Sequence, residues 1–282
     1  MESSAKAIVF IMAILVVPVG SAALAASDSP GVLTNCTGCN LSNVDWHGKS
    51  LRGARLAGAN FSGANLQGSD LRDAHFAGVD FQNADLRGAD LRGASFAGCD
   101  LRGARLHGAR LDGAHFAGID LQRGALDALD ATAARAILSD CAGCNLKGAN
   151  LAGRDLRNIR LAGADLTDAV LENADLRGAR LAGCDLKRAR ARGAKLQGAG
   201  LIGSNASGAD FTNAVLDDAA LCYEQDGKIG CTDLSGANLR GATLRRIRQC
   251  SSNARDETCN VIVSPQLLRD LAHANLAGAI TN

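Results

Sequence analysis

The sequence is poor in aromatic residues and in net charge. Aromatic residues occupy 3% of the 282 positions, with one Trp and one Tyr, which is little for the core of a globular domain of this length. The 30 Lys and Arg residues and the 29 Asp and Glu residues leave a formal net charge of +1, so neither an acidic nor a basic partner is implied. Together with the 33 glycines, these features indicate a core that is assembled in a different way.

The sequence also lacks the residue patterns of a catalytic site. No pair of carboxylates, no nucleophile beside a base and no phosphate-binding loop stands out from the rest of the chain. We therefore expect a protein that is not an enzyme, with no cofactor, no metal and no small-molecule substrate.

The N-terminal segment, residues 1–26, has the organisation of a signal peptide. Lys6 precedes an apolar run over 7–19, and small residues continue to Ala26. The run is shorter than the roughly 20 residues of a membrane span, so we expect cleavage near Ala25 or Ala26 and no integral span afterwards. An uncleaved anchor is the alternative. The expected location is outside the cytoplasm, either periplasmic or secreted, in a bacterial envelope.

The rest of the chain has a five-residue period. A large apolar residue occupies every fifth position from Leu41 to Leu121, and a mostly small residue stands two positions before each. Five residues advance about 140° round an α-helix, and an odd period alternates faces in a strand, so neither element places these residues on one side. A chain that bends at every repeat does so. Phe76, Phe96 and Phe116 recur at 20 residues, which predicts four sides per circuit.

The repeated units "ADLRG", "ANLQG" and "ARLAG" resemble the pentapeptide-repeat family. The resemblance covers residues 41–121, 146–221 and 234–244. It implies an all-β fold, a right-handed, four-sided β-solenoid with an interior of Leu, Phe and Ala. Such a fold needs covered ends.

The repeats form two related halves. "VLTNCTGCNL" at 32–41 returns as "ILSDCAGCNL" at 137–146, which is 105 residues later. We expect a first solenoid over 27–124 and a second over 141–249. Because 105 is not a multiple of 20, uninterrupted winding would rotate the second half by one side. Whether the halves form one continuous solenoid or two hinged ones stays open.

Three segments interrupt or follow the repeats. The linker 125–140 contains "DATAARAIL", which predicts a short helix with Asp130 as its N-cap. Residues 222–231 predict a hairpin insertion. The C-terminal segment 250–282 is expected to form a loop and then a capping helix that begins near Ser264.

Two charged residues break the pattern of small inward residues. Lys49 and Arg154 lie in the first coil of each half. We expect each side chain to extend out of an uncovered end of its solenoid, which would prevent stacking on another molecule.

The sequence contains 10 cysteines, four of them in two CxxC pairs. Cys36 with Cys39 and Cys141 with Cys144 fall on inward positions, where either a disulfide or a reduced pair would fill the first coil of each half. A zinc site is disfavoured because no histidine lies at ligand spacing. A redox CxxC is disfavoured because β-repeats, not a helix, follow the motif.

The remaining candidate disulfides close two polar loops. Cys222 with Cys231 and Cys250 with Cys259 each enclose eight residues. No repeat holds these loops, so an exported chain is expected to fix them with disulfides.

One side of the predicted solenoid is flat and nearly uncharged, because an Ala-Gly pair follows its large residues. We call this surface the Ala-Gly strip and predict that it is a contact face for a protein partner or for self-association. Its residues are Ala57, Gly58, Ala77, Gly78, Ala97, Gly98, Ala117, Gly118, Ala162, Gly163, Ala182, Gly183, Ile202 and Gly203. Small side chains that merely permit tight coils are the alternative explanation.

The leading functional hypothesis is an exported structural or protein-binding scaffold with no nucleic-acid partner. The resemblance suggests a second, since some members of the family resemble duplex DNA in shape and charge and bind type II topoisomerases such as gyrase. That mode needs an acidic surface and a cytoplasmic location, and the sequence predicts neither. A redox or metal protein that uses its CxxC pairs is the third.

Overall fold

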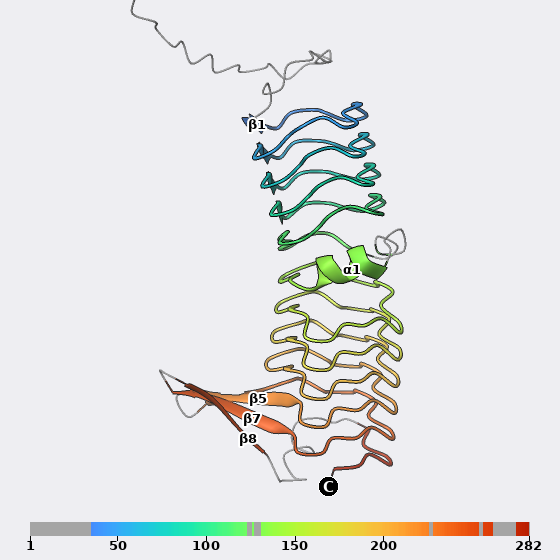
Figure 1. The fold of residues 1–282 in the computed structure, drawn as a ribbon. Helices are drawn as coiled ribbons and strands as arrows, with labels where there is room; N and C mark the ends of the chain where they lie inside the picture. The colour runs from blue at the N-terminus through green and yellow to red at the C-terminus, as the bar shows by residue number, and fades with distance from the viewer. Residues whose placement is uncertain are drawn as a thin grey trace, which may run out of the picture. The chain divides into compact units, whose positions relative to one another are not determined.

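The five-residue period becomes a chain wound in stacked coils in the computed structural model of the protein (Figure 1). The structure describes residues 35–122, 126, 131–225, 228–253, 256–261 and 275–281. These residues wind as a right-handed, four-sided β-solenoid. No helix in these ranges has the length and apolarity that a membrane crossing requires.

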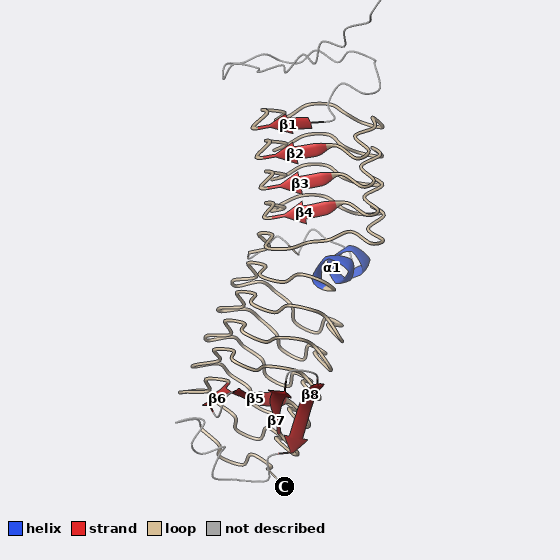
Figure 2. Ribbon diagram, turned by 90° about the vertical axis from the view of Figure 1, so that its left-hand side faces the viewer, coloured by secondary structure: helices blue, strands red, loops and turns tan. Residues whose placement is uncertain are grey.

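Four sides make one coil, and each side pairs with the same side 20 residues later. We number the sides in chain order, so that side 1 begins at Asn35, side 2 at Asn40, side 3 at Asp45 and side 4 at Ser50. Parallel bridges join these positions to residues one coil further along. On side 1 the pairing is long enough to form strands (Figure 2), namely β1 (Asn35–Thr37), β2 (Arg55–Ala57), β3 (His75–Ala77) and β4 (Ser95–Ala97).

The bends depend on left-handed backbone at the end of each side. Gly58 has φ 60°, and Asp73 and Asn83 have φ 59° and 57°. This conformation favours Gly, Asn and Asp, which explains their frequency in the repeat. An Asx side chain also caps the bend, as where the Asn60 Oδ1 accepts a 2.8 Å hydrogen bond from the Ser62 amide.

The large residues fill the interior in continuous stacks. The rings of Phe76 and Phe96 lie 5.0 Å apart between centroids, and those of Phe96 and Phe116 also lie 5.0 Å apart. Phe81, on the adjacent side 2, meets the ring of Phe76 edge-on. Inward alanines, such as Ala84, are fully buried between the large residues. The core is therefore a narrow column, and few aromatic residues are enough to fill it.

The two halves stack as one continuous solenoid. Asp120 pairs with Asn145, and the Gly118 amide donates a 2.9 Å hydrogen bond to the Ala142 carbonyl. This junction has an offset of 25 residues, so five extra residues are accommodated between the halves. Side 1 of the first half therefore continues as side 1 of the second half without rotation.

Helix α1 (Ala131–Leu138) takes the place of sides 3 and 4 in the junction coil. Its buried residues, Ala133, Ala134, Ile137 and Leu138, cover the interior there. The Arg135 Nη1 donates a 2.8 Å hydrogen bond to the Asp155 carbonyl. Helix α1 lies within the expected linker, whereas Asp130, the expected N-cap, lies outside the described residues.

The expectation of an uncovered end at Arg154 is wrong. The first coil of the second half is covered by the coil before it, and the Arg154 Nη2 donates a 3.3 Å hydrogen bond to the Leu126 carbonyl in the linker. Arg154 can replace a small inward residue because the preceding coil lacks a regular side 4 at this point. The Leu126 carbonyl of that coil accepts the hydrogen bond from its guanidinium group.

A four-stranded sheet leaves the coils near the C-terminal end (Figure 1). Its order is β6-β5-β7-β8, where two antiparallel hairpins are joined by a parallel pairing of β5 with β7. The strands are β5 (Ala220–Gln225), β6 (Lys228–Cys231), β7 (Arg248–Asn253) and β8 (Asp256–Val261). We call this the projecting sheet. It begins on side 1, since Ala220 pairs with Gly200.

The C-terminal segment differs from the expected loop and cap. Part of the expected loop forms β7 and β8, because these residues pair with each other and with β5. Asn275 and Ile280 form further repeat positions, paired with Asn238 and Thr243, because "ANLAG" at 274–278 again fits the repeat. The expected helix start at Ser264 lies outside the described residues.

Candidate interaction face

The Ala-Gly strip lies on side 1. Its alanines follow the buried large residues, and Ala77, Ala97, Ala117, Ala162 and Ala182 are all exposed. The pairing of Ala57 with Ala77 and of Ala77 with Ala97 places them directly above one another. The strip therefore presents methyl groups and backbone along successive coils.

Two strip residues were missed by the sequence reasoning. Ala142 and Gly143 follow Cys141 on side 1, directly after Ala117 and Gly118 in the stack. A search for Ala-Gly pairs at multiples of 20 residues from Ala117 does not reach them, because the coil at the junction is five residues longer than the others. With these two residues the strip passes through both halves without a break.

The glycines and alanines of the strip have different explanations. Gly58, Gly78 and Gly98 have φ of 60°, 62° and 65°, so the bend itself favours glycine. The alanine position has no such requirement, because the corresponding position of side 1 holds the larger Ile202 in the second half. The alanines therefore carry more information about function than the glycines do.

Side 1 is hollowed at its N-terminal end. A depression of about 500 Å³ lies over strands β1, β2 and β3. Its lining residues are Asn35, Cys36, Thr37, Arg55, Leu56, Ala57, His75 and Ala77. A partner side chain could enter here, beside Ala57 and Ala77 of the strip.

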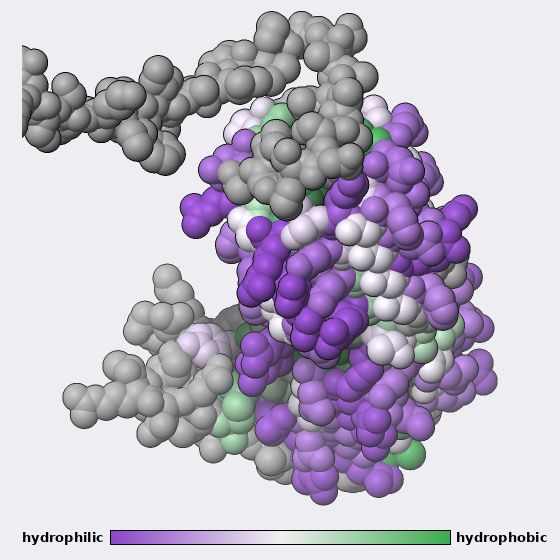
Figure 3. Space-filling view, turned by 45° about the horizontal axis from the view of Figure 1, so that its top comes forward, coloured by the Kyte–Doolittle hydropathy of each residue, from purple (hydrophilic) through white to green (hydrophobic). Residues whose placement is uncertain are grey.

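Much of the surface is hydrophilic, as the view in Figure 3 shows, where purple residues border a pale row of intermediate hydropathy. Many of the arginines on sides 2, 3 and 4 follow an aspartate by two residues in a "DLR" unit. The Arg92 Nε and Nη2 donate to the two carboxylate oxygens of Asp90 at 2.8 and 2.6 Å. The same fork-to-carboxylate pairing is made by Arg72, Arg87, Arg102, Arg157 and Arg177.

These ion pairs shift the titration of their carboxyl groups. Hydrogen bonding to Arg92 lowers the pKa of Asp90 to about 2. Hydrogen bonding to Arg72 likewise lowers the pKa of Asp70. The arginines of these units are thus neutralised locally, in agreement with the small net charge.

Three arginines of side 1 have no such partner within the described ranges, a property that they share with Arg240 on side 3 and Arg245 on side 4. Arg55, Arg160 and Arg180 are exposed, and no carboxylate among the residues described by the structure pairs with them. They precede the large residue of the repeat. Arg105 and Arg110 also precede a large residue, but they lie 4.0 and 3.7 Å from aspartates one coil away. Sequence reasoning did not single out the side 1 arginines, because only the stacking shows which carboxylates are within reach.

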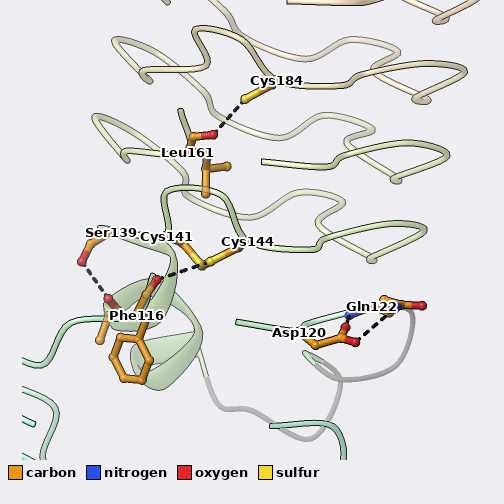
Figure 4. Close-up of a disulfide and its surroundings, with 9 residues drawn as sticks. Phe116, Asp120, Gln122, Ser139, Cys141, Cys144, Leu161 and Cys184 are labelled. Atoms are coloured by element: carbon orange, nitrogen blue, oxygen red, sulfur yellow. Dashed lines mark hydrogen bonds between the residues drawn. A yellow bond between two sulfur atoms is a disulfide. The ribbon is translucent and has the colours of Figure 1, made fainter. Parts of the chain in front are cut away.

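The candidate disulfide cysteines are brought together in four pairs. Cys141 and Cys144 form a fully buried disulfide beside α1, with the Cys144 Sγ 3.4 Å from the Phe116 carbonyl oxygen (Figure 4). Cys36 and Cys39 form the corresponding disulfide in the first coil. In the chain that the structure describes, no cluster of His, Cys, Asp and Glu could hold a metal ion.

The other two disulfides lie in the projecting sheet. Cys222 pairs with Cys231 across β5 and β6, and Cys250 pairs with Cys259 across β7 and β8. Cys222 and Cys250 are buried where the sheet leaves the coils. Each hairpin is thus closed at its base, and the turn residues 226–227 lie outside the described residues.

Two cysteines remain as free thiols, and both are buried. Burial raises the pKa of the Cys99 thiol to about 11 and that of Cys184 to about 12. The Cys184 Sγ donates a 2.9 Å hydrogen bond to the Leu161 carbonyl. These thiols act as small core residues and not as nucleophiles.

We expect thiol titration to show this partition directly. The folded, unreduced protein should show no rapidly reacting thiol at neutral pH, because both free thiols are buried and protonated. In denaturant two thiols should react, and ten after reduction. More than two in unreduced, denatured protein would contradict the disulfides.

Comparison with known proteins gives consistent matches. The model for pentapeptide repeats matches in eight overlapping copies over residues 34–123 and 144–221. Among solved structures, HetL, a pentapeptide repeat protein involved in heterocyst differentiation regulation from the cyanobacterium Nostoc sp. strain PCC 7120, is 31% identical over 74% of this chain and 84% of its own, with a TM-score of 0.28. No curated protein matches.

Two further structures are similar at lower identity. QnrB1, a plasmid-mediated fluoroquinolone resistance protein, is 20% identical over 74% of this chain and 93% of its own, with a TM-score of 0.28. A pentapeptide repeat protein from the Arabidopsis thaliana thylakoid lumen is 20% identical over 63% of this chain and 68% of its own, with a TM-score of 0.16.

Proposed function

The chain belongs to the pentapeptide-repeat family, and from that membership we propose that it is a non-enzymatic, protein-binding scaffold whose contact face is the Ala-Gly strip. In the coils that the structure describes, buried Leu, Phe and Ala side chains fill the interior of the solenoid. Its function then depends on what its sides present.

The exposed alanines of the Ala-Gly strip are the observation that supports this proposal. Ala77, Ala97 and Ala117 are exposed, and the corresponding position of side 1 holds the larger Ile202 in the second half. Backbone geometry therefore does not require alanine there. The methyl groups of these alanines lose no side-chain rotamer freedom on binding, which favours them as part of a contact surface.

We also propose that the scaffold works outside the cytoplasm. The signal peptide expected over 1–26 supports this, as do the four disulfides, because disulfides persist mainly in oxidising compartments. The small net charge disfavours imitation of duplex DNA, since that role requires an acidic surface.

Placing lysines on the strip should remove its complexes. We expect Ala77→Lys with Ala97→Lys to abolish crosslinked species in the native cell envelope, because each side chain would hold a partner away from the flat surface. Ala77 and Ala97 are exposed at the ends of β3 and β4, so the variant should fold. Crosslinking followed by identification of the captured protein, with sedimentation velocity for self-association, measures the effect.

A matched control places lysine at the same position of the repeat on other sides. Gln67→Lys with Gln82→Lys adds the same charge to sides 3 and 2, and it should keep every complex. If the strip variant and this control both keep their complexes, the strip is not the contact face.

A further inference from the structure

Arg160 and Arg180 are cations on side 1 that form no ion pair with a described carboxylate. Asp140 lies in register with Arg160 one coil earlier, but its carboxylate oxygen lies 3.7 Å from the His115 Nδ1. The two arginines lie in register on adjacent coils, about 4.8 Å apart along the stack, where like charges repel each other. Arg157 and Arg177 are stacked in the same way on side 4, but each is paired with an aspartate. On side 1 no ion pair offsets this repulsion, so the carboxylate of a ligand could relieve it.

The surroundings of this pair leave room for such a ligand. Below Arg180 the corresponding positions are Gly200 and Ala220, which bring no long side chain. Beside the pair, Ala162 and Ala182 are exposed. A carboxylate could therefore reach both guanidinium groups from the strip, with the fork geometry that Arg makes with carboxylates.

The third unpaired cation of side 1 lies at its other end. Arg55 lines the depression of about 500 Å³, together with His75. Six coil steps separate Arg55 from Arg180, which corresponds to about 29 Å at the strand spacing. About nine residues of extended chain span this distance.

We infer that side 1 binds an extended acidic segment of a partner polypeptide, whose carboxylates pair with Arg160 and Arg180 at one end and with Arg55 at the other. This inference rests on the proposed function and specifies the chemistry of its partner. A side of three extended residues is about 10 Å wide, so the site covers about 300 Å², well below the roughly 800 Å² per partner of a standard interface. A second copy is disfavoured, because facing side 1 surfaces would bring the same arginines together.

Binding of a defined peptide tests this inference on the full chain. The probe is a fluorescein-labelled, twelve-residue peptide that alternates Glu and Thr, titrated by fluorescence anisotropy at low ionic strength. Arg160→Gln with Arg180→Gln should weaken binding about tenfold, since two exposed charge pairs are removed. Arg157→Gln with Arg177→Gln removes the same charge from side 4, three residues before each of the two side 1 arginines, and it should change binding by less than about twofold.

Three results would overturn the inference. The native protein could fail to bind the peptide, or both double variants could lose binding equally, which would indicate nonspecific attraction. An oligothymidylate of equal charge could bind as tightly and with the same dependence on Arg160 and Arg180, which would make nucleic acid the partner. One further outcome separates the two proposals. If the peptide experiment fails but Ala77→Lys with Ala97→Lys still abolishes the crosslinked complexes, the proposed scaffold function is supported and only the inference of an acidic partner segment is wrong.

Discussion

Replacing Phe96 by Ala is expected to lower the free energy of unfolding by about 3 to 5 kcal/mol. The Phe96 ring is fully buried, and it contacts Phe76 and Phe116 on the coils above and below. It also lies 5.8 Å from Phe81 between centroids. The coils on both sides maintain their spacing through the backbone ladder, so the cavity cannot collapse. Urea denaturation followed by far-UV circular dichroism measures the change.

Leucine at the same position is the matched control. Leu56 and Leu161 occupy this position of side 1 in other coils, so Phe96→Leu should cost less than about 1.5 kcal/mol. Equal losses for Ala and Leu would show that the stacked rings, and not the filled volume, stabilise this part of the core.

Replacing Ile137 by Ala is expected to cost about 2 to 5 kcal/mol and to weaken the junction between the halves. Ile137 is fully buried, and α1 replaces two sides of the only interrupted coil between the halves in the described chain. No neighbouring repeat can fill the space that the side chain leaves. Urea denaturation measures the loss, and limited proteolysis should cut the variant near the linker first.

An exposed position of the same helix provides the control. Thr132 is exposed on α1, so Thr132→Ala should change stability by no more than about 0.5 kcal/mol and leave the digestion pattern unaltered. If the Ile137→Ala variant is also digested like the native protein, α1 does not stabilise the junction. The junction then depends on the backbone pairing between the halves, such as that of Asp120 with Asn145.

The core and the four sides could be predicted from the residues because each repeat contacts its neighbours in a regular way. Leu41, Phe61 and Phe81 are spaced for stacking, and the backbone bends that bring them inward need only Gly, Asn or Asp at a fixed position. The Ala-Gly strip followed from the same count, except at Ala142, where the junction adds five residues.

The junction and the C-terminal end could not be predicted in the same way. Arg154 appeared to mark an exposed end, but its partner is a carbonyl of the linker, which has no repeat pattern. The segment after Cys250 appeared to be a loop, because its strands are held by pairing with β5 and by a disulfide and not by a local pattern.

By itself the sequence determined the fold family, the four-sided coil and the side that carries small residues, since all three depend on a local period of five and on its fourfold multiple. Only the tertiary structure decided that the two halves share one register and that three arginines of side 1 lack carboxylate partners. The net charge of a chain is the sum of all its charges and does not depend on where they lie, whereas an ion pair forms only between two groups within a few ångströms of each other. A net charge of +1 is therefore compatible with unpaired cations on side 1, because the arginines of the "DLR" units on the other sides pair with the aspartate two residues before them.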